Sequence, residues 1–291
     1  MIEVYDLVDE VNKNARGFVE LFTYLLKYRI LFRGSGLEFA GLREYVPGED
    51  DASRIEWKAS LKGQKIYIKQ YEEEKDLNIF LLVDTSSSML FGTQEKLKSE
   101  YASILAATIA FAGIEVGDKV GLAMFNDGVV TFHEPSQGQD QYFQIIRSLT
   151  DEKNYGGKCN LADALTTMIN NVPERTALFI ISDFLGCGDF DDQVNMCAAK
   201  FNRVFGFMLR DPRDEKIPPG IGYISLLDPY SNTTMTVNAD KIRSRFEAEA
   251  KEQSKKVEET FVGSGSGFIK IFTNECFADP TIKYLKFIEG Y

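Results

Sequence analysis

Wholly apolar runs alternate with apolar residues at helical spacing along most of this chain. Runs with almost no polar position are typical of strands buried on both faces of a parallel sheet; they are Ile79–Val83, Val120–Phe125, Ala177–Ile181 and Val204–Met208. Between these runs, apolar residues recur every three or four positions, as in Tyr142, Ile145, Ile146 and Leu149, which is the period of a helix. Strands that alternate with helices predict an α/β fold.

Two short patterns depart from this alternation. Asp127-Gly128 joins one apolar strand to Val129–Phe132, a strong hairpin signal that predicts one antiparallel strand at the sheet edge. Ile221–Leu227 and Thr234–Val237 flank a turn-rich segment and predict a small inserted hairpin at the edge. We therefore expect a doubly wound, mostly parallel sheet flanked by helices, with one antiparallel edge strand and an inserted β-hairpin.

The first quarter of the chain has a different character. Apolar spacing in Phe18–Leu25 predicts a helix, and from Leu31 to about Glu74 charges and glycines break the pattern. We expect residues 1–75 to form N-terminal helices and an irregular segment packing on the core. Residues 76–291 would form the α/β domain, with the hairpin insertion at about 213–238 and a closing helix over Ile282–Ile288.

Charge and composition exclude several classes of function. The formal net charge of -11 opposes binding to nucleic acid or anionic lipid. No run reaches the roughly 18 apolar residues that a membrane-spanning helix needs. The four cysteines, Cys159, Cys187, Cys197 and Cys276, lack paired metal-ligand spacing, so we expect reduced thiols and a cytoplasmic protein.

The candidate chemistry lies at the end of the first apolar strand, where Asp84, Ser86 and Ser88 occupy alternate positions. Ligands of open α/β sheets bind at the carboxyl ends of strands, where the strand order reverses. A second acid, Asp183, ends another apolar strand. Oxygen ligands of this kind suit a hard cation such as Mg²⁺ or Mn²⁺. The alternative is simple capping of a helix start, for which Asp and Ser are common.

These residues also resemble a known motif. Asp84-x-Ser86-x-Ser88 after an apolar strand is similar to the metal-ion-dependent adhesion site of von Willebrand factor A domains, and Asp183 matches the later aspartate of that motif. Several preceding segments resemble the domain-of-unknown-function fifty-eight family; they are Gly34–Phe39, Arg43–Tyr45, Pro47–Asp51, Arg54–Ser60 and Tyr67–Glu74. We expect the aromatic residues Trp57, Tyr45 and Phe39 in these segments to be packing anchors rather than ligand contacts.

The resemblance implies a von Willebrand factor A-like fold and a protein-binding role. The cation would keep an open position that an acidic side chain of a partner protein completes. The same family resemblance implies work with a MoxR-type AAA+ ATPase in a chaperone-like assembly.

One position departs from the family pattern. Cys159 stands where a threonine usually completes the metal site, and a thiol is a poor ligand for Mg²⁺. Asn160 offers an amide oxygen as a substitute, or water fills the place. The metal set implied by the resemblance is thus Asp84, Ser86, Ser88 and Asp183, with Asn160 or Cys159 at the altered position.

Two other functions remain open. A von Willebrand factor A-like scaffold with a degenerate metal site is one, and a metal-assisted hydrolase is the other. Catalysis is disfavoured because Ser86 stands where a phosphatase of the haloacid dehalogenase type needs a second aspartate. The lone histidine, His133, follows the predicted edge hairpin and is read as a surface residue.

Overall fold

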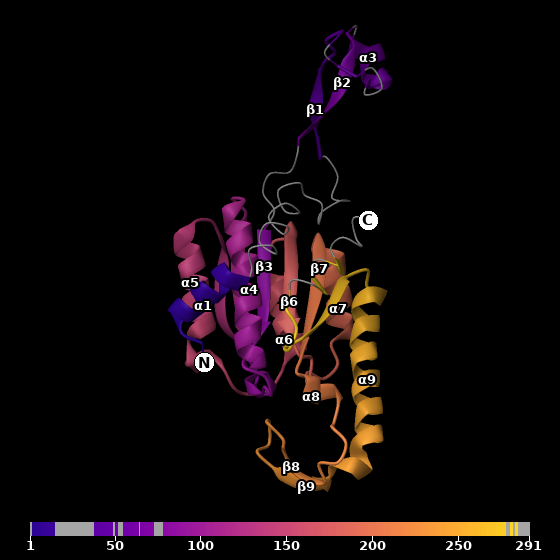
Figure 1. Ribbon diagram of the computed structural model, residues 1–291. Helices are drawn as coiled ribbons and strands as arrows, with labels where there is room; N and C mark the ends of the chain where they lie inside the picture. Colours follow the sequence, from indigo (N-terminus) through magenta and orange to yellow (C-terminus); the bar gives the residue numbers. More distant parts are fainter. Residues whose placement is uncertain are drawn as a thin grey trace. The chain divides into compact units, whose positions relative to one another are not determined.

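The computed structural model describes residues 2–14, 38–48, 50–51, 55–63, 65–72, 78–277, 280–281 and 283–284. Two compact units make up the chain: residues 1–32 with 78–291, and residues 33–77 (Figure 1). The helix expected over Phe18–Leu25 and most of the one expected over Ile282–Ile288 lie outside the described residues.

A six-stranded sheet forms the centre of the larger unit, in the order β10-β7-β6-β3-β4-β5. Neighbouring strands are parallel except for the antiparallel pair β4–β5. This confirms the predicted mostly parallel sheet and its antiparallel edge strand. The strands are β3 (Asn78–Asp84), β4 (Lys119–Phe125), β5 (Val129–Ser136), β6 (Thr176–Ser182), β7 (Arg203–Arg210) and β10 (Gly267–Phe272).

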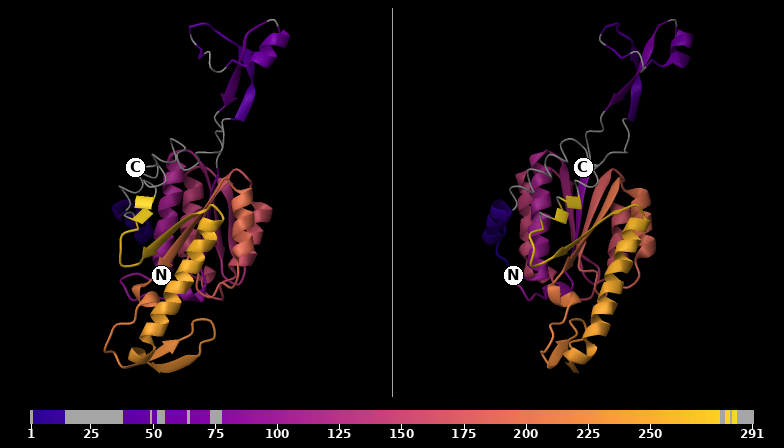
Figure 2. Two further views of the ribbon diagram at one scale, coloured as in Figure 1. Left: turned by 90° about the vertical axis from the view of Figure 1, so that its right-hand side faces the viewer. Right: turned by 45° about the vertical axis from the view of Figure 1, so that its right-hand side comes forward.

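Helices cover both faces of this sheet (Figures 1 and 2). One face carries α1 (Val4–Asn14), α4 (Lys98–Glu115) and α5 (Gln139–Thr150), and the other carries α6 (Leu161–Asn171), α7 (Asp191–Lys200) and α9 (Ala239–Gly263). Strands covered on both faces must be apolar at consecutive positions, and every residue of β6 is buried. At Gly113 in α4 the backbone approaches Ile79 and Val120 so closely that a Cβ atom would lie 2.6 Å from the Ile79 side chain.

The strand order places the switch point at β3. From β3 the chain passes to β4 on one side, and β6 pairs with β3 on the other. Because β3 and β6 are parallel neighbours, Asp84 and Asp183 come from adjacent strand ends. This reversal opens a place for ligands outside the sheet.

The inserted hairpin pairs β8 (Tyr223–Leu227) with β9 (Thr234–Asn238). It forms a separate two-stranded sheet rather than joining the edge of the central one, which corrects the predicted edge position. The short helix α8 (Pro212–Glu215) precedes it and the long helix α9 follows it. The hairpin is therefore held through its flanking helices and the contacts of its tip.

The smaller unit consists of β1 (Glu38–Glu44), antiparallel to β2 (Tyr67–Glu72), with α3 (Trp57–Gly63) between them. The Ser60 hydroxyl accepts a hydrogen bond from the Tyr67 amide at 2.8 Å and so ties α3 to β2. We expected Trp57 to be a packing anchor, but its side chain is 62% exposed. The helix α3 is short and the unit around it is small, so the unit offers too little surface to bury an indole.

Candidate functional site

A tight turn follows the central strand β3 and sets the position of the candidate residues. The Ser86 amide donates to Asp84 Oδ1 at 2.8 Å, a local bond that favours a turn over continuation of the strand. The hydroxyl oxygens of Ser86 and Ser88 lie 3.2 Å apart, and Ser87–Leu90 form a short 3₁₀ helix. Asp84, Ser86 and Ser88 thus converge, and all three are buried.

The loop before α6 is fixed against this turn by its backbone. The Gly156 amide donates to the Thr85 carbonyl at 2.8 Å, and the Ser87 amide donates to the Gly157 carbonyl at 2.9 Å. Gly157 has a φ of 79°, and a Cβ atom there would lie 2.4 Å from a carboxylate oxygen of Asp127. Only glycine fits this position, which accounts for the Gly156-Gly157 pair in the sequence.

The end of β6 supplies the second half of the site. The Ser182 hydroxyl donates to Asp84 Oδ2 at 2.6 Å and accepts from the Phe184 amide at 2.8 Å. Asp183 Oδ1 accepts from the Leu185 amide at 2.9 Å. The structure therefore brings Asp183 to the same place as Asp84, and it adds Ser182 as a link between the two strand ends.

A buried lysine pairs with Asp183. The ammonium of Lys98, at the start of α4, lies 2.7 Å from Asp183 Oδ2 and 2.9 Å from Asp214 Oδ2. Burial alone would lower the pKa of Lys98, but the two carboxylates together outweigh it and raise that pKa. Asp183 thus has one oxygen on a lysine and the other on an amide, so both of its oxygens have partners.

Asp84 is electrostatically different from Asp183. Its described partners are hydroxyl and N–H groups, and no cation is among the groups that act on its pKa. Burial and the negative charge of Asp183 raise the pKa of Asp84 to about 7, although the Ser182 and Ser86 hydrogen bonds oppose this. Asp84 is therefore the carboxylate at this site that would gain most from a bound cation.

Cys159 forms a disulfide with Cys187, so the prediction of reduced thiols is wrong for this pair. The two loops that carry them converge at the strand ends, where the two Cα atoms are 4.5 Å apart. The sulfur of Cys159 is 3.6 Å from Asp84 Oδ2. Cys159 thus occupies the position expected for the altered ligand, with its sulfur already bonded. Cys197 and Cys276 are free, as expected.

Asn160, the other candidate at the altered position, has a different structural role. Its side-chain oxygen accepts from the Asp163 amide at 3.3 Å and caps α6, and its side-chain nitrogen donates to the Asp127 carbonyl at 3.2 Å. Both ends of the amide are thereby engaged outside the cluster of Asp84, Ser86 and Ser88. N-capping is an ordinary role for asparagine.

A tyrosine at the tip of the inserted hairpin closes the site. The Tyr230 hydroxyl donates to the Leu185 carbonyl at 2.7 Å. Burial raises the pKa of Tyr230, while the nearby Ser88 and Ser86 hydroxyls oppose this, and the charges of Asp183 and Asp84 add to the rise. The phenol therefore lies against the hydroxyl pair and helps to bury it.

Four residues of this arrangement were not among the site candidates that the sequence offered: Lys98, Ser182, Cys187 and Tyr230. A signal was available for Ser182, which directly precedes Asp183 at a strand end. The spacing of Cys159 and Cys187 did not specify a pairing, since connectivity follows from the tertiary fold.

His133 lies within β5 with its ring nitrogen 2.8 Å from the Ser148 hydroxyl, and burial lowers its pKa.

The mostly parallel sheet with its antiparallel edge strand and helices on both faces has a von Willebrand factor A-like fold. Residues 41–256 match the family model described as protein of unknown function DUF58, and the chain belongs to this family. Among the helices of the described residues, none is both long and apolar enough to cross a membrane.

The relatives include the uncharacterized protein Rv1480 of Mycobacterium tuberculosis, 26% identical over 258 residues that cover 88% of this chain and 80% of that protein. The uncharacterized protein YeaD of Bacillus subtilis is 33% identical over 128 residues, which are 44% of this chain and 28% of YeaD. Among solved structures, BatB from Bacteroides thetaiotaomicron matches 74% of this chain and 100% of its own at 14% identity, with a TM-score of 0.45. The SpRpn10 VWA domain matches 71% of this chain and 94% of its own at 9% identity, with a TM-score of 0.39.

Proposed function

We propose that this chain is a non-catalytic protein-binding module that holds Mg²⁺ or Mn²⁺ at the Asp84–Ser88 turn and recognises an acidic side chain of a partner protein. The observation that carries this proposal is the hydroxyl pair of Ser86 and Ser88, 3.2 Å apart beside an Asp84 carboxylate that lacks a cationic partner. An octahedral Mg²⁺ with bonds of about 2.1 Å places neighbouring ligands about 3 Å apart, which matches this pair.

The donor set fits a hard cation only in part. Ser86 and Ser88 would contact the ion, and Asp84 would supply the main negative charge. Asp183 contributes through its charge, because both its oxygens already have partners. Cys159 and Asn160, the two candidates at the altered position, are engaged elsewhere, so water would fill that place.

Access for a partner requires the hairpin tip to move. Tyr230 lies against the hydroxyl pair, in the region where an acidic side chain would approach the cation. A carboxylate that meets a bound cation forms a strong charge-assisted contact, which would compensate for the hydrogen bond that Tyr230 loses. The family resemblance extends this proposal to a MoxR-type AAA+ ATPase as the partner.

A scaffold with a degenerate metal site is the second candidate function, because the disulfide stands where the family has a threonine. Calorimetric titration of the purified chain with Mg²⁺ separates the two. We expect binding to the wild type, none to Ser86→Ala or Asp84→Ala, and full binding to Ser87→Ala, which removes a hydroxyl of the same turn outside the pair. Absence of binding to the wild type would support the scaffold.

Affinity capture then tests recognition of a partner. Wild-type bait with Mg²⁺ is compared with the same bait in chelator and with Asp84→Ala. A protein retained only by the Mg²⁺-loaded wild type supports metal-dependent recognition, and equal retention by all three baits contradicts it.

A further inference from the structure

We propose that Asp84, Cys159 and Cys187 form a second kind of metal site, for a borderline-soft divalent cation such as Zn²⁺, when the disulfide is reduced. One carboxylate oxygen and the two sulfur atoms all lie within 4.8 Å of one another, and all three residues are buried. Ligands of a tetrahedral zinc site with Zn–S bonds of about 2.3 Å stand about 3.8 Å apart. After reduction the two sulfur atoms are no longer bonded to each other, and rotation of both side chains about their Cα–Cβ bonds would separate them to this distance.

The three ligands come from three chain segments, and hydrogen bonds hold these segments together independently of the disulfide. The Cys159 loop is bonded to the turn after β3 through Gly156 and Gly157. The Cys187 loop is held at two successive carbonyls: Gln253 of α9 donates to Phe184 at 2.8 Å, and Tyr230 donates to Leu185 at 2.7 Å. Cleaving the S–S bond leaves these contacts in place, so the ligands would remain close together, as a preorganised site requires.

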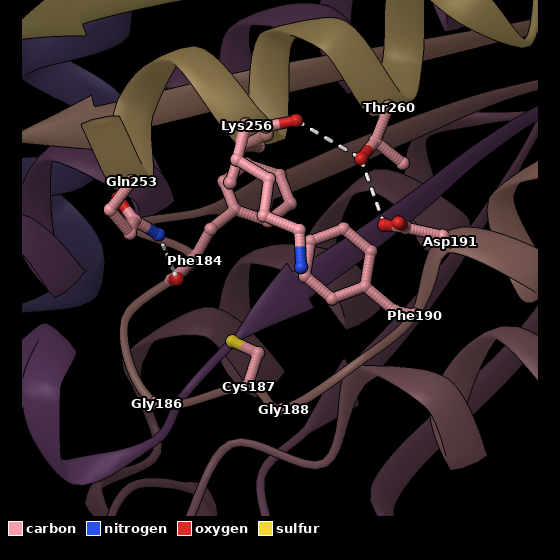
Figure 3. Close-up of a pocket in the computed structure, with 10 residues that line it drawn as sticks. Phe184, Gly186, Cys187, Gly188, Phe190, Asp191, Gln253, Lys256 and Thr260 are labelled. Atoms are coloured by element: carbon pink, nitrogen blue, oxygen red, sulfur yellow. Dashed lines mark hydrogen bonds between the residues drawn. The ribbon is translucent and has the colours of Figure 1, made fainter. Parts of the chain in front are cut away.

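Both cysteines are buried, and Cys187 lines a pocket. A pocket of about 220 Å³ opens between the loop after β6 and helix α9, and Cys187 lines it between Gly186 and Gly188 (Figure 3). The side chain of Lys256 extends into the same pocket. A nearby ammonium stabilises a thiolate, which favours attack on this disulfide by a thiolate reductant.

The redox step balances with a dithiol as reductant. The dithiol delivers two electrons and two protons, its own sulfurs become a disulfide, and the Cys159–Cys187 bond gives two thiols. Binding of one divalent cation then releases these two protons as both sulfurs ligate as thiolates. Asp84 supplies the third ligand, and a water completes the tetrahedron.

The two metal sites share Asp84 and are therefore mutually exclusive. Hydroxyl and carboxylate oxygens select Mg²⁺ or Mn²⁺, whereas two thiolates select Zn²⁺. The zinc site does not depend on the hydroxyl pair of Ser86 and Ser88. A failure of the zinc proposal and a failure of the proposed protein-binding function can therefore be distinguished. The oxidation state of Cys159 and Cys187 would decide which cation the end of β3 prefers.

The test is titration of the purified full chain with Co²⁺ as a coloured probe and with Zn²⁺ in competition. A trialkylphosphine reduces the disulfide without adding a competing thiol. We expect one Co²⁺ per reduced chain with thiolate-to-cobalt absorption, displaced by Zn²⁺, and binding roughly 100-fold weaker to the oxidised chain. Cys187→Ser should abolish the thiolate absorption, and Asp84→Asn should weaken binding roughly tenfold or more.

Three comparisons make the outcome decisive. Reduced wild type is the reference for Cys187→Ser, because both lack the disulfide and share any loss of stability. Cys197→Ser and Cys276→Ser, at the two free cysteines, should bind Co²⁺ like the wild type. Ser86→Ala should lose Mg²⁺ and keep Co²⁺. Equal Co²⁺ affinity of reduced and oxidised chains, or thiolate absorption that survives Cys187→Ser, would overturn the proposal.

Discussion

The ammonium of Lys98 lies 2.7 Å from the carboxylate of Asp183, and neither side chain is more than 1% exposed to solvent. A buried ion pair adds little net stability compared with an apolar pair, but loss of one partner leaves an uncompensated charge in the interior. Here Asp183 and Asp214 would keep Arg210 as a cation acting on them but lose their ion pairs with Lys98, and Asp183 acts directly on the carboxylate of Asp84. The pair therefore links the stability of the domain to the charge of the candidate site.

Lys98→Met removes this positive charge. We expect the free energy of unfolding, measured in urea with chelator present, to fall by about 3–5 kcal/mol. The variant should bind Mg²⁺ more tightly than the wild type, because the site has gained negative charge. Lys255→Met is the control, since Lys255 forms an exposed ion pair with Glu259 in α9 and should cost less than about 1 kcal/mol. Similar stability of both variants would contradict a structural role for Lys98.

Asp84→Asn should stabilise the metal-free protein at high pH. The folded-state pKa of Asp84 is raised to about 7, so the folded chain holds a proton that the unfolded chain has already released. Wild-type stability therefore falls as pH rises from about 4 to about 7, by about 4 kcal/mol at most. Asparagine carries no such cost and keeps an oxygen for the Ser86 amide.

Urea unfolding at pH 5 and pH 8 in chelator measures this difference. The stability gap between Asp84→Asn and wild type should widen at pH 8, and Mg²⁺ should narrow it by stabilising the wild type alone. Asp189→Asn, in the exposed part of the loop after β6, should show no gap. A gap of the same size at both pH values would refute the assignment to the Asp84 carboxyl.

Tyr230→Ala should open the candidate site. A cation and its retained waters need the space that the phenol fills against Ser86 and Ser88. We expect the Mn²⁺ dissociation constant, measured from the electron paramagnetic resonance signal of free Mn²⁺, to fall several-fold. Tyr223→Ala removes an exposed tyrosine of the same hairpin and should leave Mn²⁺ binding unchanged. An unchanged constant in Tyr230→Ala would mean that the phenol does not obstruct the site.

Trp57→Ala tests whether the smaller unit uses its indole for packing. Trp57 is exposed and lines a shallow pocket with Leu61 and Ile66, so we expect its loss to cost less than about 1 kcal/mol. Ile68→Ala removes a buried residue of β2 in the same unit and should cost about 2–5 kcal/mol. Thermal unfolding followed by circular dichroism compares them, and a larger loss for Trp57→Ala would restore its role as a packing anchor.

Much of the fold was predictable because its strands are apolar over their whole length. Ile79–Val83 and Ala177–Ile181 can only be buried on both faces, and this requirement fixes a layered α/β sheet. The same reasoning placed Asp84 and Asp183 at the ends of buried strands, but it did not determine that these strands are neighbours. Burial of Lys98 could not be predicted, since a lysine in the first turn of a helix ordinarily faces solvent.

The covalent and long-range parts of the site were also beyond sequence patterns. The Cys159–Cys187 bond depends on two loops meeting at the strand ends, and Tyr230 reaches Leu185 across 45 residues of sequence. Local periodicity carries no information on such contacts. The exposure of Trp57 likewise reflects how little surface a unit of 45 residues can bury. The sequence around Trp57 does not show how small this unit is, so the indole was expected to be buried.

The order of the strands has a consequence for synthesis of the chain on the ribosome. β3 lies at the centre of the sheet, but its partner β6 begins at Thr176, almost a hundred residues after Asn78. At about 5–20 residues per second, β3 waits roughly 5–20 seconds for that partner. The apolar run Ile79–Val83 is unpaired on that side during this interval. Nascent chains of this protein therefore depend on protection from aggregation until β6 has emerged, and slowing translation between the two strands should lower the yield of folded protein.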